Sequence, residues 1–337
     1  MGTNIATIKW NCYFCLTANE HIYMKITRLL AILILAIPTA AIAQDRKNPD
    51  SKITVIYEND AHCTLPGYAK MATLKSQTLK ETKNVLTVSG GDFTVDFMSR
   101  STLGTKSQGA GIIQLMNAVG YDFIVPGNHD FDFGLPVLEK NVKDLEATTL
   151  CCNFRKLAGD SPVTVFPASS IREIDGVKIA FIGVATPRTM SGRNKANFSD
   201  ADGKLLYTFC DSTLFDEVQS TVDAVRRDGA DYVIVLSHLG DKQNSLPTSL
   251  QLIAGTAGID VVLDAHAHSV IPAQNVDDKD GKAVLLTSTG LKFANIGVLT
   301  IDTDGSIGSK LVPTQDIEED AGVTELIGNL KKEYGLE

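Results

Sequence analysis

The sequence predicts an α/β fold, and three observations lead to this prediction. From residue 51 onward, short apolar runs rich in Val and Ile alternate with longer segments of helical periodicity. Polar residues follow directly after several of these runs, as they do where parallel strands end at a binding crevice. No internal repeat, low-complexity tract or linker divides residues 51–314. We therefore expect one large α/β domain.

The first half of this domain is expected to alternate regularly between strands and helices. Short apolar runs that end in glycine or polar residues predict strands in KITVIYEND, NVLTVSGGD, DFIVPGNHD and ATTLCCNF. Apolar residues at helical spacing predict helices over 67–82, 107–120 and 135–145.

The second half contains a long polar stretch between predicted elements. VKIAFIGVAT is expected to be a strand that follows a turn at Asp175-Gly176, and residues 187–204 are expected to form a surface loop. A helix over 211–227, capped by Asp211 or Ser212, and another over 248–254 precede a short C-terminal helix. The remaining strands are predicted in DYVIVLSHLGD, IDVVLDAHAHS, KAVLLTSTG and ANIGVLTIDTDG.

The first 43 residues have the features of a targeting segment. Lys25 and Arg28 precede the apolar run LLAILILAI, and the small residues AIA stand just before Gln44, which is the order found in secretory signals. A membrane anchor or a buried helix is the alternative. The apolar stretch that ends at Ala43 is only 15 residues long and contains a proline, whereas a membrane span needs roughly 18 to 20 residues.

We therefore divide the chain into three parts. Residues 1–23 carry features that no signal requires and are expected to precede the true start at Met24. Residues 24–43 are expected to be a signal peptide without a stable membrane span. Residues 44–337 are expected to form a single catalytic domain of a protein exported to the periplasm or secreted.

Charge and cysteine content limit the possible partners. The formal net charge of −9 disfavours polyanionic partners such as DNA, so no nucleic-acid partner is expected. An exported protein can form disulfides but does not require them. We expect the adjacent Cys151 and Cys152 to be strand residues rather than a redox pair, and leave open whether Cys63, Cys151, Cys152 or Cys210 form disulfides.

Five of the six histidines stand at predicted strand ends, together with two aspartates and an asparagine. A single strand-end histidine is more often a structural hydrogen-bonding residue than a ligand, but so many coincidences favour a shared site. Imidazole, carboxylate and amide groups suit Zn, Mn or Fe, and these are too many for one tetrahedral ion. Two divalent ions sharing a carboxylate fit better. Such a pair holds a bridging hydroxide and supports displacement at phosphorus, so the residues predict metal-assisted phosphoester hydrolysis.

The motifs at these strand ends also resemble those of a known family. DAH, GGD, GNHD, SH and AHAH, in this order, resemble the five blocks of the calcineurin-like metallophosphoesterases. NDAH, GNHDFD, IAFIGVATP and SHLGD resemble in particular the catalytic domain of the 5′-nucleotidase and UDP-sugar hydrolase family, over residues 51–314. The resemblance implies a four-layer fold in which helices flank a sandwich of two β-sheets, with the metals at the strand ends.

The resemblance further implies a role for each polar residue. The ligands it implies are Asp60, His62 and His268 on one metal and Asn128, His238 and His266 on the other, with Asp92 bridging them. His129 matches the catalytic histidine that faces the phosphate, and Asp132 matches the aspartate that orients it and favours its protonated form. We expect Gly127 to permit the tight turn that aims both neighbours, and Asp130 to be only a solvated or capping carboxylate.

The sequence departs from the family pattern in three ways. Cys63 and Ala265 stand where glycine is usual and could tilt neighbouring ligands. A thiolate at Cys63 could compete for an ion, although a small apolar filler is favoured. Family members usually carry a second domain whose aromatic residues grip the nucleoside. We expect no such domain in this chain, and a separately encoded partner could supply it.

The function expected from the sequence is that of an exported dimetal phosphohydrolase releasing phosphate from nucleoside 5′-monophosphates. Hydrolysis of 2′,3′-cyclic nucleotides, UDP-sugars, sulfur esters or a broad range of phosphoesters remains open, because no residue distinguishes these small substrates. A non-catalytic metal-binding module is disfavoured, since neither a ligand nor the catalytic histidine is missing.

Overall fold

Two six-stranded sheets form the centre of the computed structural model, which describes residues 46–336 except 100, 159–161 and 246. The leader expected at residues 1–43 lies outside the described residues. The first sheet has the order β15-β14-β1-β2-β3-β4. Its strands are β1 (Ile53–Glu58), β2 (Val85–Ser89), β3 (Phe123–Ile124), β4 (Thr148–Thr149), β14 (Asn295–Ile301) and β15 (Ile307–Pro313).

The second sheet has the order β12-β13-β11-β10-β8-β7. Its strands are β7 (Ser169–Ile174), β8 (Val177–Ala185), β10 (Tyr232–His238), β11 (Val261–Asp264), β12 (Val270–Asp277) and β13 (Ala283–Thr289). A small third sheet contains β5 (Arg155–Lys156), β6 (Val163–Thr164) and β9 (Tyr207–Thr208). In both large sheets the central strands run parallel, so their carboxyl ends lie at one edge.

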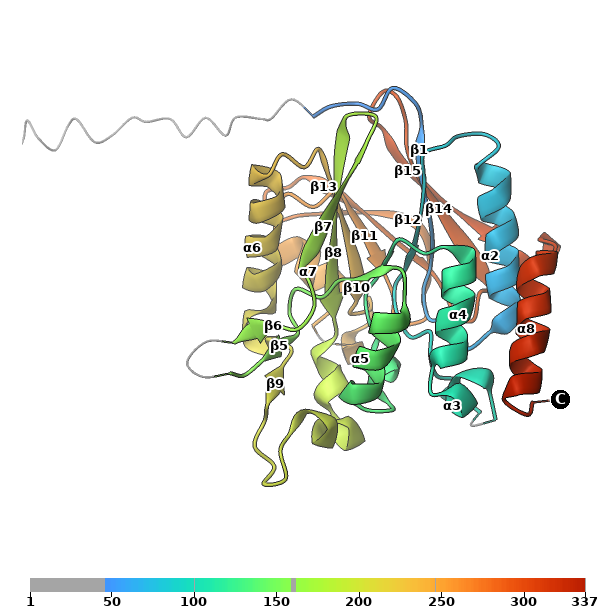
Figure 1. The fold of residues 1–337 in the computed structure, drawn as a ribbon. Coiled ribbons are helices and arrows are strands. Elements are labelled where there is room, and N and C mark those ends of the chain that lie inside the picture. Colours follow the sequence, from blue (N-terminus) through green and yellow to red (C-terminus); the bar gives the residue numbers. More distant parts are fainter. Residues whose placement is uncertain (1–45, 100, 159–161, 246, 337) are drawn as a thin grey trace, which may run out of the picture. The chain divides into compact units, whose positions relative to one another are not determined.

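Helices cover the outer faces of the two large sheets (Figure 1). The first sheet carries α2 (Leu65–Thr78), α4 (Ala110–Val119) and α8 (Ala321–Glu333), and the second carries α6 (Leu214–Arg227) and α7 (Ser249–Gly255). Two further helices, α3 (Leu103–Ser107) and α5 (Leu135–Asp144), lie on the loops after β2 and β3. The predicted arrangement of two sheets flanked by helices is confirmed.

The alternation of side chains along each strand produces these layers. In β8, Phe181 faces the other sheet, where its ring stacks on Phe123 with centroids 4.6 Å apart. The neighbouring Ala180 and Ile182 face the helices on the opposite side. Because both faces of β8 are buried, its sequence is a continuous apolar run and was recognisable as a strand.

Several sequence predictions about local structure were wrong. The strands predicted in DFIVPGNHD and ATTLCCNF contain only two strand residues each, and Cys151 and Cys152 lie buried just after β4 rather than in a strand. The predicted helix over 107–120 is broken where Gln108 and Gly109 adopt φ angles of 52° and 90°. The N-cap of α6 is Thr213, so neither predicted cap residue caps that helix.

The stretch 187–204 is not simply a surface loop. It contains the 3₁₀ helices η2 (Pro187–Met190) and η3 (Gly192–Phe198). The ring of Phe198 is fully buried and packs in an aromatic cluster with Phe131, Phe154 and Phe209. The contacts between Phe198 and these three rings hold the segment 187–204 beside the site, although polar residues dominate its sequence.

Among residues 46–336, no helix has the length and apolar character needed to cross a bilayer.

Candidate metal centre

The carboxyl ends of the parallel strands gather the predicted polar residues at one edge of the sandwich. In the first sheet, Asp60 and His62 follow β1 and Asp92 follows β2, whose last residues pair in register. In the second sheet, β10 ends at His238 and pairs with β11, after which His266 and His268 follow. Asn128 begins the 3₁₀ helix η1 (Asn128–Phe131) after β3. The structure therefore brings together seven residues from five separate segments of the chain.

These residues form two groups that could each hold a cation. Asp60, His62 and His268 form one group, and Asp92, His238 and His266 form the other. Within each group the potential ligand atoms lie within 4.8 Å of one another. Asn128 lines the same cavity as His266 and His268 and so lies beside both groups.

Asp92 belongs to the second group but also reaches the first. Its Oδ2 atom is 3.3 Å from Nε2 of His238 in one group and 3.7 Å from Nε2 of His62 in the other. Its Oδ1 atom accepts a hydrogen bond of 2.8 Å from the backbone N–H of His129. One carboxylate oxygen is thus held by the backbone, while the other reaches both groups.

Backbone carbonyls orient two of the histidines. Nδ1 of His62 lies 2.7 Å from the carbonyl oxygen of Val95, and Nδ1 of His238 lies 2.7 Å from that of Gly90. Because a carbonyl only accepts, each Nδ1 carries the proton and donates it, and Nε2 is directed at the centre. Histidines that bind metals typically donate their other ring N–H to a carbonyl in this way.

Two buried polar atoms test whether these residues fit a metal. Within the described part of the chain, Oδ1 of Asn128 is buried without a hydrogen-bond partner, and Nε2 of His238 is buried with only the Asp92 carboxylate nearby, at 3.3 Å. A buried polar atom without a partner costs roughly 1–3 kcal/mol. Both atoms are good ligands for borderline divalent ions, so the residues fit a metal centre.

Electrostatics adjust the protonation of the cluster. Burial would raise the pKa of Asp92, but the positive charges of His238, His62 and His129 lower it. Burial would lower the pKa of His238, but the charge of Asp92 raises it to about 10. Burial and the charge of His238 lower the pKa of His266 to about 4. A cation bound here would displace the proton of His238, because a ligating imidazole is neutral.

The backbone is strained where the potential ligands lie. Left-handed φ angles occur at Asp60 (53°), His62 (40°), Asp92 (59°), His266 (72°) and His268 (56°). Each such residue costs on the order of 1–3 kcal/mol, and such strain clusters at functional sites. Five of the seven predicted ligands are therefore held in conformations that the surrounding structure imposes.

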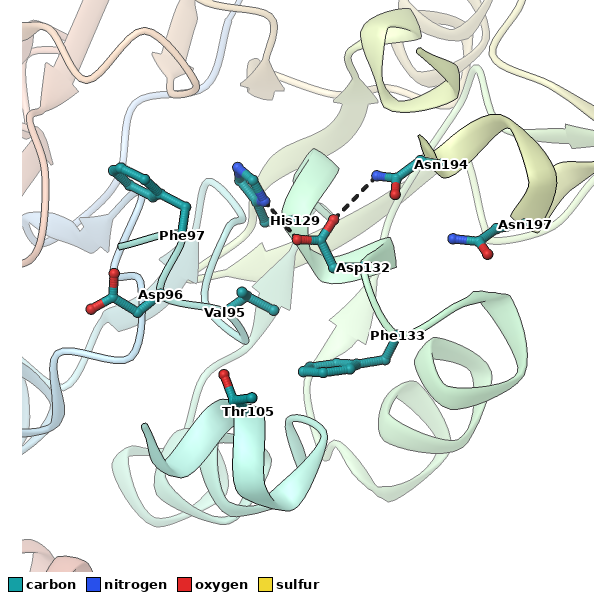
Figure 2. A pocket seen from close by; sticks show the side chains of 9 residues that line it. All are labelled: Val95, Asp96, Phe97, Thr105, His129, Asp132, Phe133, Asn194 and Asn197. Carbon is teal, nitrogen blue, oxygen red and sulfur yellow. Dashed lines mark hydrogen bonds and ion pairs between the residues drawn. The ribbon is translucent and has the colours of Figure 1, made fainter. Parts of the chain in front are cut away.

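His129 and Asp132 form a separate pair beside the two groups. Nδ1 of His129 lies 2.8 Å from Oδ2 of Asp132, and Asn194 donates a hydrogen bond of 3.1 Å to Oδ1 of the same aspartate (Figure 2). Burial would lower the pKa of His129, but Asp132 and the nearby charge of Asp92 raise it to about 9. The hydrogen bond to Asp132 therefore holds the ring of His129 in place and favours its protonated form, while the catalytic role that the resemblance implies for this pair stays a prediction.

Of the two roles predicted for Asp130, solvated or capping carboxylate, the structure shows the capping one. Its buried carboxylate accepts hydrogen bonds of 2.8–3.1 Å from the backbone N–H groups of Gly127, Asp92, Phe93 and Thr94. It is a capping residue, and it ties the loop that carries Asp92 to the turn that carries His129. The sequence did not predict its bonds to Asp92, Phe93 and Thr94, because these three residues lie 36–38 positions away in the chain.

The reason for glycine at position 127 also differs from the prediction. Gly127 has a φ of −85°, which other residues adopt readily, so the turn itself does not require glycine. A Cβ atom here would lie 2.2 Å from Oδ1 of Asp92 and 2.6 Å from Cε1 of His238. Gly127 is needed because two potential ligands pack directly against its backbone.

None of the four cysteines in the described residues belongs to either candidate group. Sγ of Cys63 donates to the carbonyl oxygen of Thr94 at 2.9 Å, and burial raises the pKa of this thiol to about 11. Cys63 is therefore a protonated, buried filler rather than a competing thiolate. Cys151, Cys152 and Cys210 are free thiols, and burial raises the pKa of Cys151 to about 12, which disfavours a reactive thiolate there.

Two positively charged side chains near the centre, Arg188 and Lys242, were not predicted from the sequence. A cavity of about 440 Å³ is lined by Asn128, His266 and His268 and also by Arg188 and Lys242. The guanidinium of Arg188 donates to the carbonyl of Asn244, and Lys242 Nζ donates to that of Ala267 at 2.7 Å. Among the ion pairs of the described residues, neither cation has a carboxylate partner. Both can therefore attract an anionic ligand.

Comparison with known proteins identifies the class. The trifunctional nucleotide phosphoesterase protein YfkN of Bacillus subtilis is 24% identical over 335 residues, covering 86% of this chain and 22% of that protein. The 2′,3′-cyclic-nucleotide 2′-phosphodiesterase/3′-nucleotidase of Haemophilus influenzae is 24% identical over 336 residues, covering 86% of this chain and 50% of that protein. This chain thus spans at most half the length of these curated relatives.

A solved structure supports the same assignment of the fold. The calcineurin-like phosphoesterase YfkN of Bacillus subtilis has a TM-score of 0.69 at 21% identity, covering 85% of this chain and 98% of that one. The fold is thus that of a calcineurin-like phosphoesterase, and the chain is similar to relatives named as nucleotide phosphoesterases. Within that class, the family described as "Bacterial capsule synthesis protein PGA_cap" matches residues 105–286, more than half of the chain, and the chain belongs to it.

Proposed function

We propose that this chain is a two-metal phosphohydrolase that releases phosphate from nucleoside 5′-monophosphates. The position of Asp92 carries the proposal, because its Oδ2 atom reaches an imidazole of each group. A shared carboxylate suits two cations roughly 3.5 to 4 Å apart, the spacing used in phosphoester hydrolysis. His129 lies directly beside this carboxylate, and its backbone N–H donates a hydrogen bond to Oδ1 of Asp92.

The proposal assigns a role to each residue of the centre. Asp60, His62 and His268 would hold one ion, Asn128, His238 and His266 would hold the second, and Asp92 would be shared between them. Imidazole, carboxylate and amide donors suit Zn, Mn or Fe. When bound, the two ions supply positive charge that polarises phosphoryl oxygens and lowers the pKa of water.

The chain's own residues position and stabilise the phosphoryl group. Because Asp132 occupies Nδ1 of His129, Nε2 is the ring nitrogen that remains to face the substrate. A protonated His129 stabilises the negative charge on the phosphoryl group during transfer. Arg188 and Lys242, on the other side of the centre, add positive charge that attracts the anionic substrate.

The proposal treats residues 44–337 as one catalytic domain of an exported protein. Export rests on the sequence of residues 24–43 alone. In cells, the mature chain should begin near Gln44, which an intact-mass measurement of the purified protein checks. A mature chain that still contains Met24 would contradict export by this signal.

Hydrolysis of a substrate panel tests the proposed function. AMP, 2′,3′-cyclic AMP and UDP-glucose should be assayed with Mn or Zn, and phosphate release from AMP is expected to be the fastest. A chelator should abolish this activity and added metal should restore it. Failure to cleave any phosphoester, or activity that a chelator leaves unchanged, would refute the proposal.

One alternative retains the same centre. The Haemophilus influenzae relative bears the name of a cyclic-nucleotide phosphodiesterase and 3′-nucleotidase. Faster cleavage of 2′,3′-cyclic AMP than of AMP would favour this second function without changing the metal ligands.

A further inference from the structure

A second cavity, of about 410 Å³, opens beside His129 (Figure 2). His129 and Asp132 line this cavity, whereas Arg188 and Lys242 line the cavity of about 440 Å³ described above. Its walls come from three distant segments: the loop after β2, the turn after η1, and η3. The residues that matter for its chemistry are Phe97, His129, Asp132, Phe133, Asn194 and Asn197.

Phe97 provides an exposed aromatic surface next to the centre. Its side chain is 46% exposed. Its ring is nearly parallel to that of His129, at 22° with centroids 5.9 Å apart, and to that of His268, at 20° and 5.7 Å. It meets the ring of His62 edge-on at 4.7 Å. Phe133 forms a second aromatic wall of the cavity (Figure 2). Exposed rings held in this way are suited to stacking against a planar ligand.

The polar groups of the cavity favour a neutral ligand. Nδ2 of Asn194 donates to the carboxylate of Asp132, and Nδ2 of Asn197 donates to the carbonyl oxygen of Phe131. Among the hydrogen bonds of the described residues, the Oδ1 atom of each amide accepts none. Asp96 also lines the cavity, and its carboxylate pairs with Lys292 at 2.9 Å. Two carboxylates and the absence of Lys or Arg among the described lining residues disfavour a further phosphate group.

The position of His129 relates this cavity to the reaction. Hydrolysis breaks the P–O bond to the alcohol, water supplies the new oxygen on phosphorus, and a proton ends on the departing alcohol. His129 faces the phosphoryl group in the proposed function and also lines this cavity. The alcohol portion of the substrate can therefore occupy the cavity while the phosphoryl group lies at the centre.

We propose that this cavity binds the nucleoside portion of a nucleoside monophosphate, with Phe97 and Phe133 against the base and Asn194 and Asn197 as hydrogen-bonding groups. The inference rests on the proposed function and adds to it a nucleoside-binding site within this domain. It makes Phe97 a specificity-determining residue. Planar, neutral alcohols are selected over aliphatic ones and over leaving groups that carry further phosphates.

Substitution of Phe97 tests the cavity with two substrates. In Phe97→Ala, kcat/KM for AMP should fall roughly 10- to 100-fold, the scale of a lost base-stacking contact, while kcat/KM for glycerol 3-phosphate should change little. Phe97→Trp should retain the preference for AMP. Met98→Ala is the matched control, because Met98 is adjacent, 75% exposed and outside the cavity lining, and should behave as wild type.

Adenosine binding provides a measurement that does not depend on turnover. In calorimetric titration of the full chain with a chelator present, wild type and Met98→Ala should bind adenosine, and Phe97→Ala should bind it at least about 10-fold more weakly. Equal losses on both esters, or unchanged adenosine binding in Phe97→Ala, would overturn the inference. If wild type cleaves neither ester, the proposed function fails, and the adenosine titration alone decides whether the cavity binds nucleosides.

Discussion

Replacing Asp92 with asparagine is expected to abolish nearly all turnover and to reduce the content of bound metal. The loss should exceed the roughly 10²- to 10³-fold cost of removing one charge-stabilising donor. A neutral amide removes the negative charge that holds two cations close together. Whichever way the amide is oriented, its nitrogen replaces an oxygen that now faces either the backbone N–H of His129 or the imidazoles of His62 and His238.

Metal content and activity measured on the same sample check this prediction. Elemental analysis should find fewer ions per chain in Asp92→Asn than in wild type, and AMP hydrolysis should be close to background. Asp202→Asn is the control, because this carboxylate is exposed in a turn and should have no effect. Two bound ions with full activity in Asp92→Asn would show that Asp92 does not bridge.

Replacing His129 with asparagine is expected to have a different signature. The metal content should stay near that of wild type, because neither ring nitrogen of His129 belongs to the two candidate groups. The value of kcat should fall by roughly 10²- to 10³-fold, the usual cost of removing one donor that stabilises developing charge. Steady-state kinetics with elemental analysis separate the two effects. Loss of metal in this variant would mean that His129 is a ligand.

Much of the site could be predicted because the central strands are buried on both faces. Such strands give continuous apolar runs, and the polar residues after them are then assigned to one edge of the sheet. This reasoning predicted that His238 and His266, 28 residues apart, lie together, and the structure places them in one group. Their roles as ligands remain a proposal.

Features that depend on distant packing could not be predicted. The edge strands β7, β12 and β15 expose much of their surface, so no apolar run marks them. The sequence predicts Asp130 to be either solvated or capping, and its burial follows only from the packing of the loop that carries Asp92. The cavity beside His129 combines Phe97, Phe133 and Asn194, and no local pattern connects these three segments.

The most direct test of the two-metal centre is an anomalous difference map from crystals grown with Mn. We predict two peaks with the Asp92 carboxylate between them. One should lie beside Asp60, His62 and His268, and the other beside Asn128, His238 and His266. A single peak, or two peaks without Asp92 in contact with both, would contradict it.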